Sequence, residues 1–336
     1  MNEPMLNTQY NFPMPVIAAG FLGPALVPNQ DIDWDETKLP LNPDALVQKI
    51  MGQPMRRAGR FIKLVCCGAL TCLQSAPKEV WEGKRVGIFL STGLGNIDEI
   101  LPFITQVFKH DGGFPSPNQF ANSVSNAAAF FLAKICGVKG IILTISQEEL
   151  SFESALWLAQ SYLASGEIDL ALVGGCDVFT PTISEYRDRM NLKPGNYRPA
   201  PMGEGSSWLL LGGNSEKKIG DILSVELSSD PAEIGKTTPD HLLQQCEGLA
   251  AGLLPRCEDR KISCLLLPGF RLAGLDEVSW KKRGWDIDDY LPHCGISSTA
   301  SAYGLARALL LHQPALMVHC NYHTTGRQAL VTAITK

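Results

Sequence analysis

The sequence has no excess of basic residues, no long apolar run and no paired-cysteine motif. Its 336 residues include 29 Lys and Arg against 34 Asp and Glu, a formal net charge of −5, whereas nucleic-acid-binding proteins usually carry a basic excess. No apolar run reaches the roughly 18 residues of a membrane-spanning helix. The opening residues, MNEPMLNTQYNF, lack the positively charged and then apolar pattern of a signal peptide. We therefore expect a cytoplasmic protein with no nucleic-acid partner and no membrane partner.

The ten cysteines do not form the pattern of a disulfide framework or a zinc site. Cys66 and Cys67 are adjacent, and others, such as Cys176, lie in apolar stretches, which is typical of small buried side chains. The nearest approach to a metal-binding cluster is His319, Cys320 and His323, and no second ligand pair follows at a zinc-finger spacing. We expect no metal, and a packing role for Cys176.

Short apolar runs alternate with helix-like segments along the whole chain. Continuous apolar strands separated by helices indicate a sheet that is covered on both faces, which is an α/β architecture. In the first part the expected strands are Val16–Gly20, Val86–Ser91, Gly140–Ile145, Leu170–Gly174 and Trp208–Leu211, and the expected helices are Arg57–Gln74, Asn96–Lys109, Asn118–Cys136 and Leu150–Ser165.

The second part of the chain repeats this order in shortened form. The expected strands are Ile222–Leu227, Cys264–Leu267, Leu316–Cys320 and Leu330–Ile334, with helices at Asp240–Leu253 and Ser298–His312. A series that occurs twice predicts two similar halves, 1–214 and 215–336, packed into one integrated unit and joined near Asn214–Lys218. The Pro-rich stretch Phe179–Pro201 is irregular and is typical of a lid or an interface segment, whereas Trp280–Tyr290 indicates little.

The segment that begins at Asn118 carries a specific series of motifs. It contains the turn Gly137-Val138-Lys139-Gly140, then a strand, an amphipathic helix, Gly166-Glu167-Ile168-Asp169 and an apolar strand closed by Gly174-Gly175. Downstream, Gly203-Glu204-Gly205-Ser206 matches a Gly-Glu-Gly-Ala turn. Together these motifs resemble β-ketoacyl synthases, the condensing enzymes of the thiolase fold. The resemblance covers nearly the whole chain and implies a layered αβαβα core.

The catalytic trio of that family is missing from this sequence. The family uses a cysteine at a helix N-terminus, where the helix dipole lowers the thiol pKa, and two histidines that bind the malonyl thioester carbonyl. Aligned on the glycine motifs, the cysteine position falls on Glu149, and the two histidine positions fall on Pro268 and Ser298. The resemblance therefore implies no catalytic residues here.

Two further family features are altered. The loop whose phenylalanine gates the acyl pocket aligns with His323, Thr324, Thr325 and Gly326, with Thr324 in the gate position. The lysine that usually precedes the second histidine aligns near His293.

A ketosynthase-like chain without the trio resembles the chain-length factor, the β subunit of bacterial type II polyketide synthase ketosynthases. Many members of that class carry glutamine at the cysteine position, so Glu149 is a departure. The resemblance implies a heterodimer with a cysteine-bearing ketosynthase, and a phosphopantetheinylated acyl carrier protein that presents the chain. It implies no cofactor of this subunit's own, and a product such as an aromatic polyketide or an aryl polyene.

The resemblance also places four apolar side chains at the dimer interface, where they close the acyl tunnel: Phe120, Val124, Phe130 and Phe131. An alternative is a role in the core, because Phe120, Val124 and Ala127 follow the i, i+4, i+7 spacing of a helical stripe.

Glu149 and the histidines leave other interpretations open. Glu149 is either a general base or, as we favour, the last residue of a capping box that starts at Ser146. His319 is a core residue or an outward-facing one, and His323 has a structural or a residual catalytic role. The alternative functions are a stand-alone thioester decarboxylase or hydrolase that uses Glu149 and His323, and an inert homodimeric scaffold.

Overall fold

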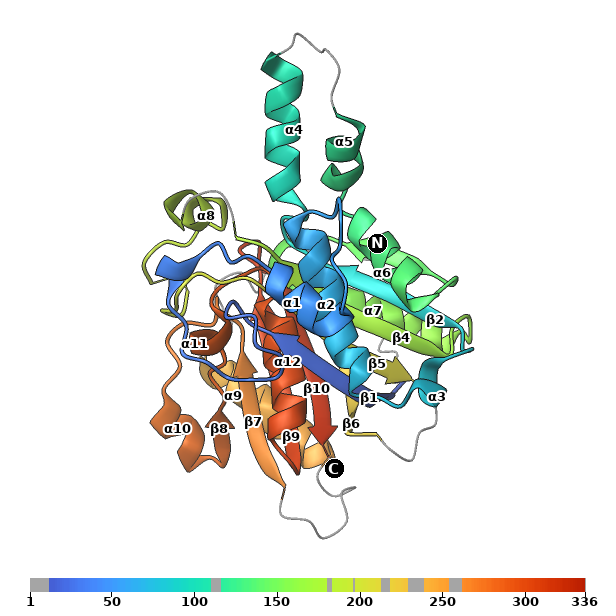
Figure 1. Ribbon diagram of the computed structural model, residues 1–336. Helices are drawn as coiled ribbons and strands as arrows, with labels where there is room; N and C mark the ends of the chain where they lie inside the picture. The colour runs from blue at the N-terminus through green and yellow to red at the C-terminus, as the bar shows by residue number, and fades with distance from the viewer. Residues whose placement is uncertain are drawn as a thin grey trace, which may run out of the picture.

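A single mixed sheet of ten strands organises the computed structural model, which describes residues 12–109, 116–179, 183–195, 197–212, 218–228, 239–253 and 262–335. The strands lie in the order β3-β2-β4-β5-β1-β6-β10-β9-β7-β8 (Figure 1). Their bounds are Met14–Leu22 (β1), Val86–Ser91 (β2), Ile142–Ile145 (β3), Leu170–Asp177 (β4), Gly205–Gly212 (β5), Gly220–Ser228 (β6), Ser263–Pro268 (β7), Trp285–Ile287 (β8), Ala315–Tyr322 (β9) and Gln328–Thr335 (β10).

The two halves of the sheet have the same strand order. Reading inward from each edge gives β3-β2-β4-β5-β1 in one half and β8-β7-β9-β10-β6 in the other. In both halves the outer three strands are parallel and the inner pair is antiparallel. β1 and β6 pair over Met14–Val16 and so join the halves. The expected repetition of one strand–helix series is confirmed.

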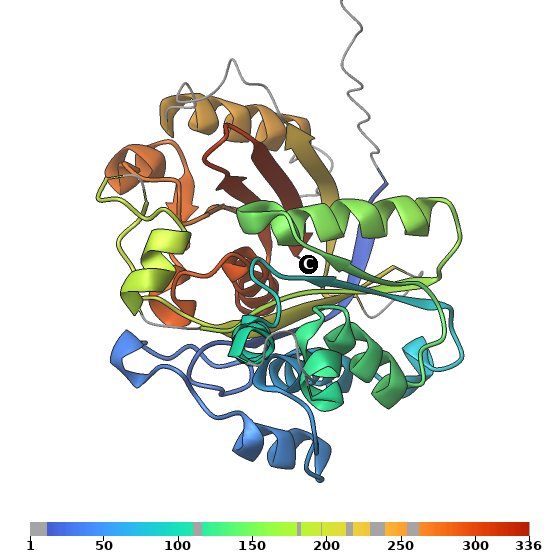
Figure 2. The same ribbon diagram turned by 90° about the horizontal axis from the view of Figure 1, so that it is seen from above.

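Helices fill three layers around the two halves of the sheet (Figure 2). α2 and α6 cover the first half, α7 and α12 share one hydrophobic cluster with strands of both halves, and α9 and α10 cover the second half. This is the expected αβαβα arrangement. The helices longer than one turn are Asp44–Met51 (α1), Arg60–Gln74 (α2), Ile97–Lys109 (α4), Pro117–Ser123 (α5), Ala127–Cys136 (α6), Ser151–Ala164 (α7), Ile183–Arg189 (α8), Pro239–Leu253 (α9), Glu277–Lys282 (α10) and Ala300–Leu311 (α12). Two short helices are Lys78–Trp81 (α3) and Leu291–Cys294 (α11).

One local expectation is wrong, and two segments contain elements that were not predicted. The single helix predicted over Asn118–Cys136 is broken at Val124, whose extended backbone (φ −85°, ψ 128°) separates α5 from α6. The irregular stretch Phe179–Pro201 contains α8, and the uninformative tract Trp280–Tyr290 supplies the edge strand β8. Packing explains β8, because Trp280 and Trp285 meet edge to face beneath the sheet. Among the helices described, none has the length and hydropathy needed to cross a bilayer.

A buried charge network ties α12 to the segments that flank it. The Arg307 guanidinium bonds both Asp31 and Asp288, and His312 Nε2 lies 2.9 Å from Asp288 Oδ2. Burial alone would raise the pKa of the Asp288 carboxyl, but His312 and Arg307 hold it below its usual value of 3.8. Ionised Asp288 therefore stabilises the fold at pH values above 3.8. This contribution to the free energy of unfolding disappears as the pH falls through the lowered pKa of Asp288.

We expect Asp288→Asn to lower the free energy of unfolding by about 3 kcal/mol at pH 7, because it leaves Arg307 partly uncompensated in a buried site. The difference from the wild type should shrink as the pH falls from 3.8 through the lowered pKa of Asp288. Urea unfolding at several pH values measures both effects. Asp286→Asn, at an exposed carboxylate two residues away, is the control; an equal loss in both variants, or one independent of pH, would contradict the prediction.

Candidate functional site

Asp177 holds together the loops that carry the site. It is the last residue of β4 and is fully buried. Its Oδ1 accepts from the Gly93 amide (2.9 Å) and the Thr92 hydroxyl (3.0 Å), and its Oδ2 accepts from the Thr299 amide (2.9 Å) and hydroxyl (2.9 Å). Burial raises the pKa of Asp177, and these donors oppose the rise. One carboxylate thus fixes the turn after β2 against the start of α12, where Ser298 lies.

The Gly174-Gly175 pair is explained by two close approaches. A side chain at Gly174 would overlap the indole of Trp208 on β5, and one at Gly175 would meet Thr299 and Ala302 of α12.

Glu204, from the Gly-Glu-Gly motif, is buried and accepts from the amides of Leu41 and Phe179 and from the Arg60 guanidinium. Cys176 is fully buried, which raises the pKa of its thiol well above the ordinary value, in agreement with the expected packing role.

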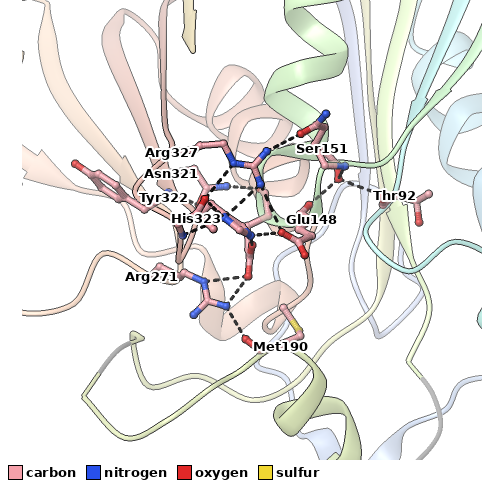
Figure 3. Close-up of polar contacts among 12 residues, drawn as sticks. Thr92, Glu148, Ser151, Met190, Arg271, Asn321, Tyr322, His323 and Arg327 are labelled. Carbon is pink, nitrogen blue, oxygen red and sulfur yellow. Dashed lines mark hydrogen bonds and ion pairs between the residues drawn. The ribbon is translucent and has the colours of Figure 1, made fainter. Parts of the chain in front are cut away.

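Glu149, which the sequence comparison aligned with the family's cysteine, is buried and paired with Arg271. Figure 3 shows Arg271 beside Met190. It lies in a short turn, Glu148–Leu150, directly before α7. Its Oε1 accepts from Arg271 Nε at 2.9 Å and also from Nη2, and the same Nη2 donates to the Met190 carbonyl. A guanidinium therefore covers one oxygen of the Glu149 carboxylate.

The capping box that we favoured is wrong. The Ser146 hydroxyl donates to the Gly93 carbonyl, and Ser151 accepts from the Gln147 amide instead. Helix α7 begins at Ser151, two residues beyond Glu149. Glu149 turns toward Arg271 because a buried carboxylate needs a counter-charge.

The two other altered positions lie nearby and carry no ionisable group. Pro268 ends β7, and Gly269 next to it packs against Asn321, whose Nδ2 donates to the Glu149 carbonyl at 2.7 Å. Ser298 is buried against Gly93. Pro and Ser supply neither an imidazole acid nor a base, so neither replaces the family's histidines.

The altered gate loop brings His323 to the same place. His323 Nε2 contacts Glu148 and lies 3.4 Å from Glu149 Oε2, while Thr324 is exposed. Its Nδ1 accepts from the Thr325 amide (3.2 Å) and lies 3.3 Å from Arg327 Nη2. Two donors on Nδ1 leave the imidazole proton on Nε2, where it faces the two carboxylates.

Glu148, Glu149 and His323 place one possible ligand atom each within 4.8 Å of one another. A metal-bound histidine usually donates its second N–H to an acceptor, whereas His323 Nδ1 faces donors. Arg271 and Arg327 already lie against the two carboxylates. These residues therefore do not fit a cation. The cluster considered from the sequence, His319, Cys320 and His323, does not come together. His319 pairs with Glu153, and Cys320 Sγ lies 3.9 Å from Gln328 Nε2.

His319 belongs to the core, one of the two alternatives. It is fully buried, with Nδ1 2.9 Å from the Leu267 carbonyl and Nε2 2.7 Å from Glu153 Oε1. Asn321 bridges Glu153 and the Glu149 carbonyl. His293, at the family's lysine position, lies 4.0 Å from Asp33. Arg271, Glu153 and Asn321 were not singled out from the sequence; the one available signal was that a buried Glu149 requires a cation.

The apolar side chains assigned to the tunnel lie away from this pocket, on the surface. Phe120, Val124 and Phe130 are 57%, 41% and 62% exposed, so the core alternative is wrong for them, and Phe131 is partly buried. Figure 1 shows α4 and α5 projecting side by side from the body. Phe108 of α4 and Ile142 of the edge strand β3 are also exposed.

Replacing Arg271 with Met should lower the free energy of unfolding by about 3 kcal/mol, because Glu149 would remain buried and uncompensated. The double variant Arg271→Met/Glu149→Leu should recover most of this loss, since an apolar pair of similar volume needs no counter-charge. Urea unfolding of both variants measures the coupling. Arg283→Met, which removes an exposed pair with Glu247, should cost less than about 1 kcal/mol. A double variant less stable than Arg271→Met would contradict the prediction.

Known proteins resemble the chain in fold and over part of its sequence. Residues 36–198 match the family model of the β-ketoacyl synthase N-terminal domain. The ishigamide ketosynthase/chain length factor matches with a TM-score of 0.72 and 16% identity over 96% of this chain and 99% of that one. The type II polyketide synthase complex AntDE:AntF, in which an acyl carrier protein is bound to its ketosynthase, matches with a TM-score of 0.69 and 13% identity over 96% and 99%.

A β-ketoacyl synthase from Burkholderia phymatum STM815 matches with a TM-score of 0.68 and 15% identity, over 96% of this chain and 99% of that one. Among curated protein sequences none matches the chain. Identities this low compare folds only, and the family match covers the part of the chain that carries Glu149. Residues 36–198 are similar to the β-ketoacyl synthase N-terminal domain, and the chain as a whole has the thiolase-like fold of the solved ketosynthases.

Proposed function

We propose that the chain is a non-catalytic chain-length-factor subunit of a type II polyketide synthase. In this role it pairs with a cysteine-bearing ketosynthase and shapes the tunnel for the growing chain. The observation that carries the proposal is the Arg271–Glu149 ion pair at the position of the nucleophile. A carboxylate covered by a guanidinium accepts no acyl group from a thioester, and Pro268 and Ser298 supply no proton carrier beside it.

The exposed apolar surface supports a partner. Phe108 and Phe120 on the projecting helices, Val124, Phe130 on α6 and Ile142 on the edge strand are all at least 36% exposed. Contiguous exposed apolar side chains mark interaction sites, and an uncovered edge strand is a template for pairing with another chain. A sheet continued across the two subunits would bury both features at once.

In this proposal the partner's cysteine would carry out the condensation, and this chain would shape the tunnel for the growing chain. Val124 lies at the break between α5 and α6, where its side chain is free to reach a neighbouring subunit. The growing chain would be presented by a phosphopantetheinylated acyl carrier protein. The solved complexes that are similar in fold include a ketosynthase/chain length factor and a ketosynthase with its carrier protein.

A second candidate, a stand-alone thioester decarboxylase or hydrolase, is favoured by one observation. His323 Nε2 lies 3.4 Å from Glu149 Oε2, so the two residues of that hypothesis do meet. Against it, the His323 proton already faces two carboxylates, and Arg271 occupies the other oxygen of Glu149. A general base needs a free lone pair directed at the substrate, and this arrangement leaves none on His323.

Activity distinguishes the two candidates. Co-expressed with a cysteine-bearing ketosynthase and supplied with malonyl carrier protein, Glu149→Gln should keep at least half of the product formation, because the amide oxygen still accepts from Arg271. Replacing the partner's cysteine with alanine should abolish it. The purified chain alone should not release CO2 or free malonate from malonyl carrier protein. Turnover by the chain alone that is lost in Glu149→Gln and in His323→Asn would establish the enzyme instead.

Subunit association tests the surface. Phe130→Glu and Phe120→Glu should each weaken the heterodimer at least 100-fold, because a carboxylate would be buried without a counter-charge in an apolar interface. Size-exclusion chromatography and isothermal titration measure the change. Val278→Glu is the matched control, since Val278 on α10 is as exposed as Phe130, at 62%. Equal association of all three variants would exclude this surface as the interface.

A further inference from the structure

A large hollow lies at the end of the first half-sheet opposite the candidate site. It is bounded by the C-terminal ends of α2 and α6, by α3 and by the start of β2, and its volume is about 1070 Å³. Val86, the first residue of β2, lines it, whereas Thr92, just beyond the last residue, belongs to the Asp177 cluster. At about 3.3 Å per residue, β2 separates the two by roughly 20 Å. We call this hollow the basic groove.

The charge around the groove has one sign. Lys78, Lys84, Arg85, Lys134 and Lys139 line it, against a single acid, Glu82. Arg85 is paired with Asp169, but the four lysines are exposed and have no ion pair within the residues that the structure describes. On a chain with a net charge of −5, such a concentration focuses a positive potential in one concavity and attracts anions.

Helix ends account for only part of this charge. Lys134 lies in the last turn of α6, where a cation favourably meets the helix dipole. Lys78 instead begins the short helix α3, and Lys84 and Lys139 lie in the connections that precede β2 and β3. These three lysines have no dipole to complement.

The floor of the groove is apolar. Leu70 and Leu73 of α2 line it together with Val138, Cys136 and the ring of Trp81. The Trp81 Nε1–H is enclosed, with no acceptor among the residues that the structure describes, so only the apolar part of the indole faces the hollow. The hollow thus combines an apolar surface with a rim of cations.

We propose that the basic groove binds a small anionic amphiphile: an alkyl or aromatic body that lies on the Leu73 and Trp81 floor, with a phosphate or carboxylate group held by the rim lysines. The volume lies at the upper end of the range for small-molecule pockets. Point-charge ammonium groups on flexible stems suit a phosphate or carboxylate of variable position. This inference does not depend on the proposed function, because the groove and the Glu149 pocket share no residue.

Isothermal titration of the full chain with monomeric dodecyl phosphate, below its critical micelle concentration, tests the proposal. We expect saturable binding at one site. A second titration, with dodecanoate, distinguishes a site for a carboxylate head group from one for a phosphate head group. Inorganic phosphate, which has no tail, should bind at least tenfold more weakly, and dodecyltrimethylammonium, which has the same tail and the opposite charge, should not saturate. Absence of saturable binding by both anionic amphiphiles would overturn the proposal.

Charge reversal locates the site. Lys134→Glu/Lys139→Glu and, separately, Lys78→Glu/Lys84→Glu should each weaken dodecyl phosphate binding at least tenfold. The matched control is Lys281→Glu/Lys282→Glu, which makes the same change at two exposed lysines of α10. Equal binding in all three variants, or equal loss in all three, would overturn the assignment to the groove. Sedimentation of the chain with phosphatidylglycerol vesicles, without binding of monomeric amphiphile, would make the groove a membrane contact and contradict the small-ligand proposal.

Discussion

The ion pair between Arg271 and Glu149 is the interaction on which the arrangement of the site depends. Both side chains are almost fully buried, and a buried charge without its partner costs several kcal/mol. The loop after β7 must therefore lie against the turn before α7, and Arg271 also fixes the Met190 carbonyl at the end of α8. Three segments far apart in the sequence converge on one guanidinium. In this arrangement Oε1 of Glu149 is engaged by the Arg271 guanidinium.

The spacing of apolar residues predicted an element well where all of its residues are buried, and poorly where some of them are exposed. Strands such as Val86–Ser91 are buried on both faces, so their apolar runs are unambiguous. The helix expected over Asn118–Cys136 failed because its apolar residues face outward, and an apolar stripe that faces outward has the same spacing as one that faces the core. β8 is three residues long; it pairs with β7, and Trp285 packs on Trp280. Such contacts between distant segments leave no periodic signal.

The place of Glu149 in the fold could be predicted from the sequence, but its side-chain partners could not. Spacing from the glycine motifs placed Glu149 correctly at the start of the helix after β3, because glycines that permit a close approach, such as Gly174 against Trp208, fix the register of the chain. The side-chain partners were not accessible in the same way. A capping box and a buried ion pair both satisfy a glutamate in that position, and the choice depends on an arginine 122 residues away. The role of Asp177 was likewise invisible, since its donors come from two loops that only the fold brings together.

The buried polar contacts of Asp177 and Glu204 do not depend on the residues that carry out the reaction in the ketosynthase family. Asp177 ties β4 to the starts of two loops, and Glu204 ties β5 to Arg60 of α2. Neither contact involves the positions of the missing trio. Those three positions contribute little to the sheet, because Glu149 lies in a turn, Pro268 ends a strand and Ser298 precedes a helix. Side chains at these three positions can therefore change while the contacts of Asp177 and Glu204 still hold the strands and their loops together.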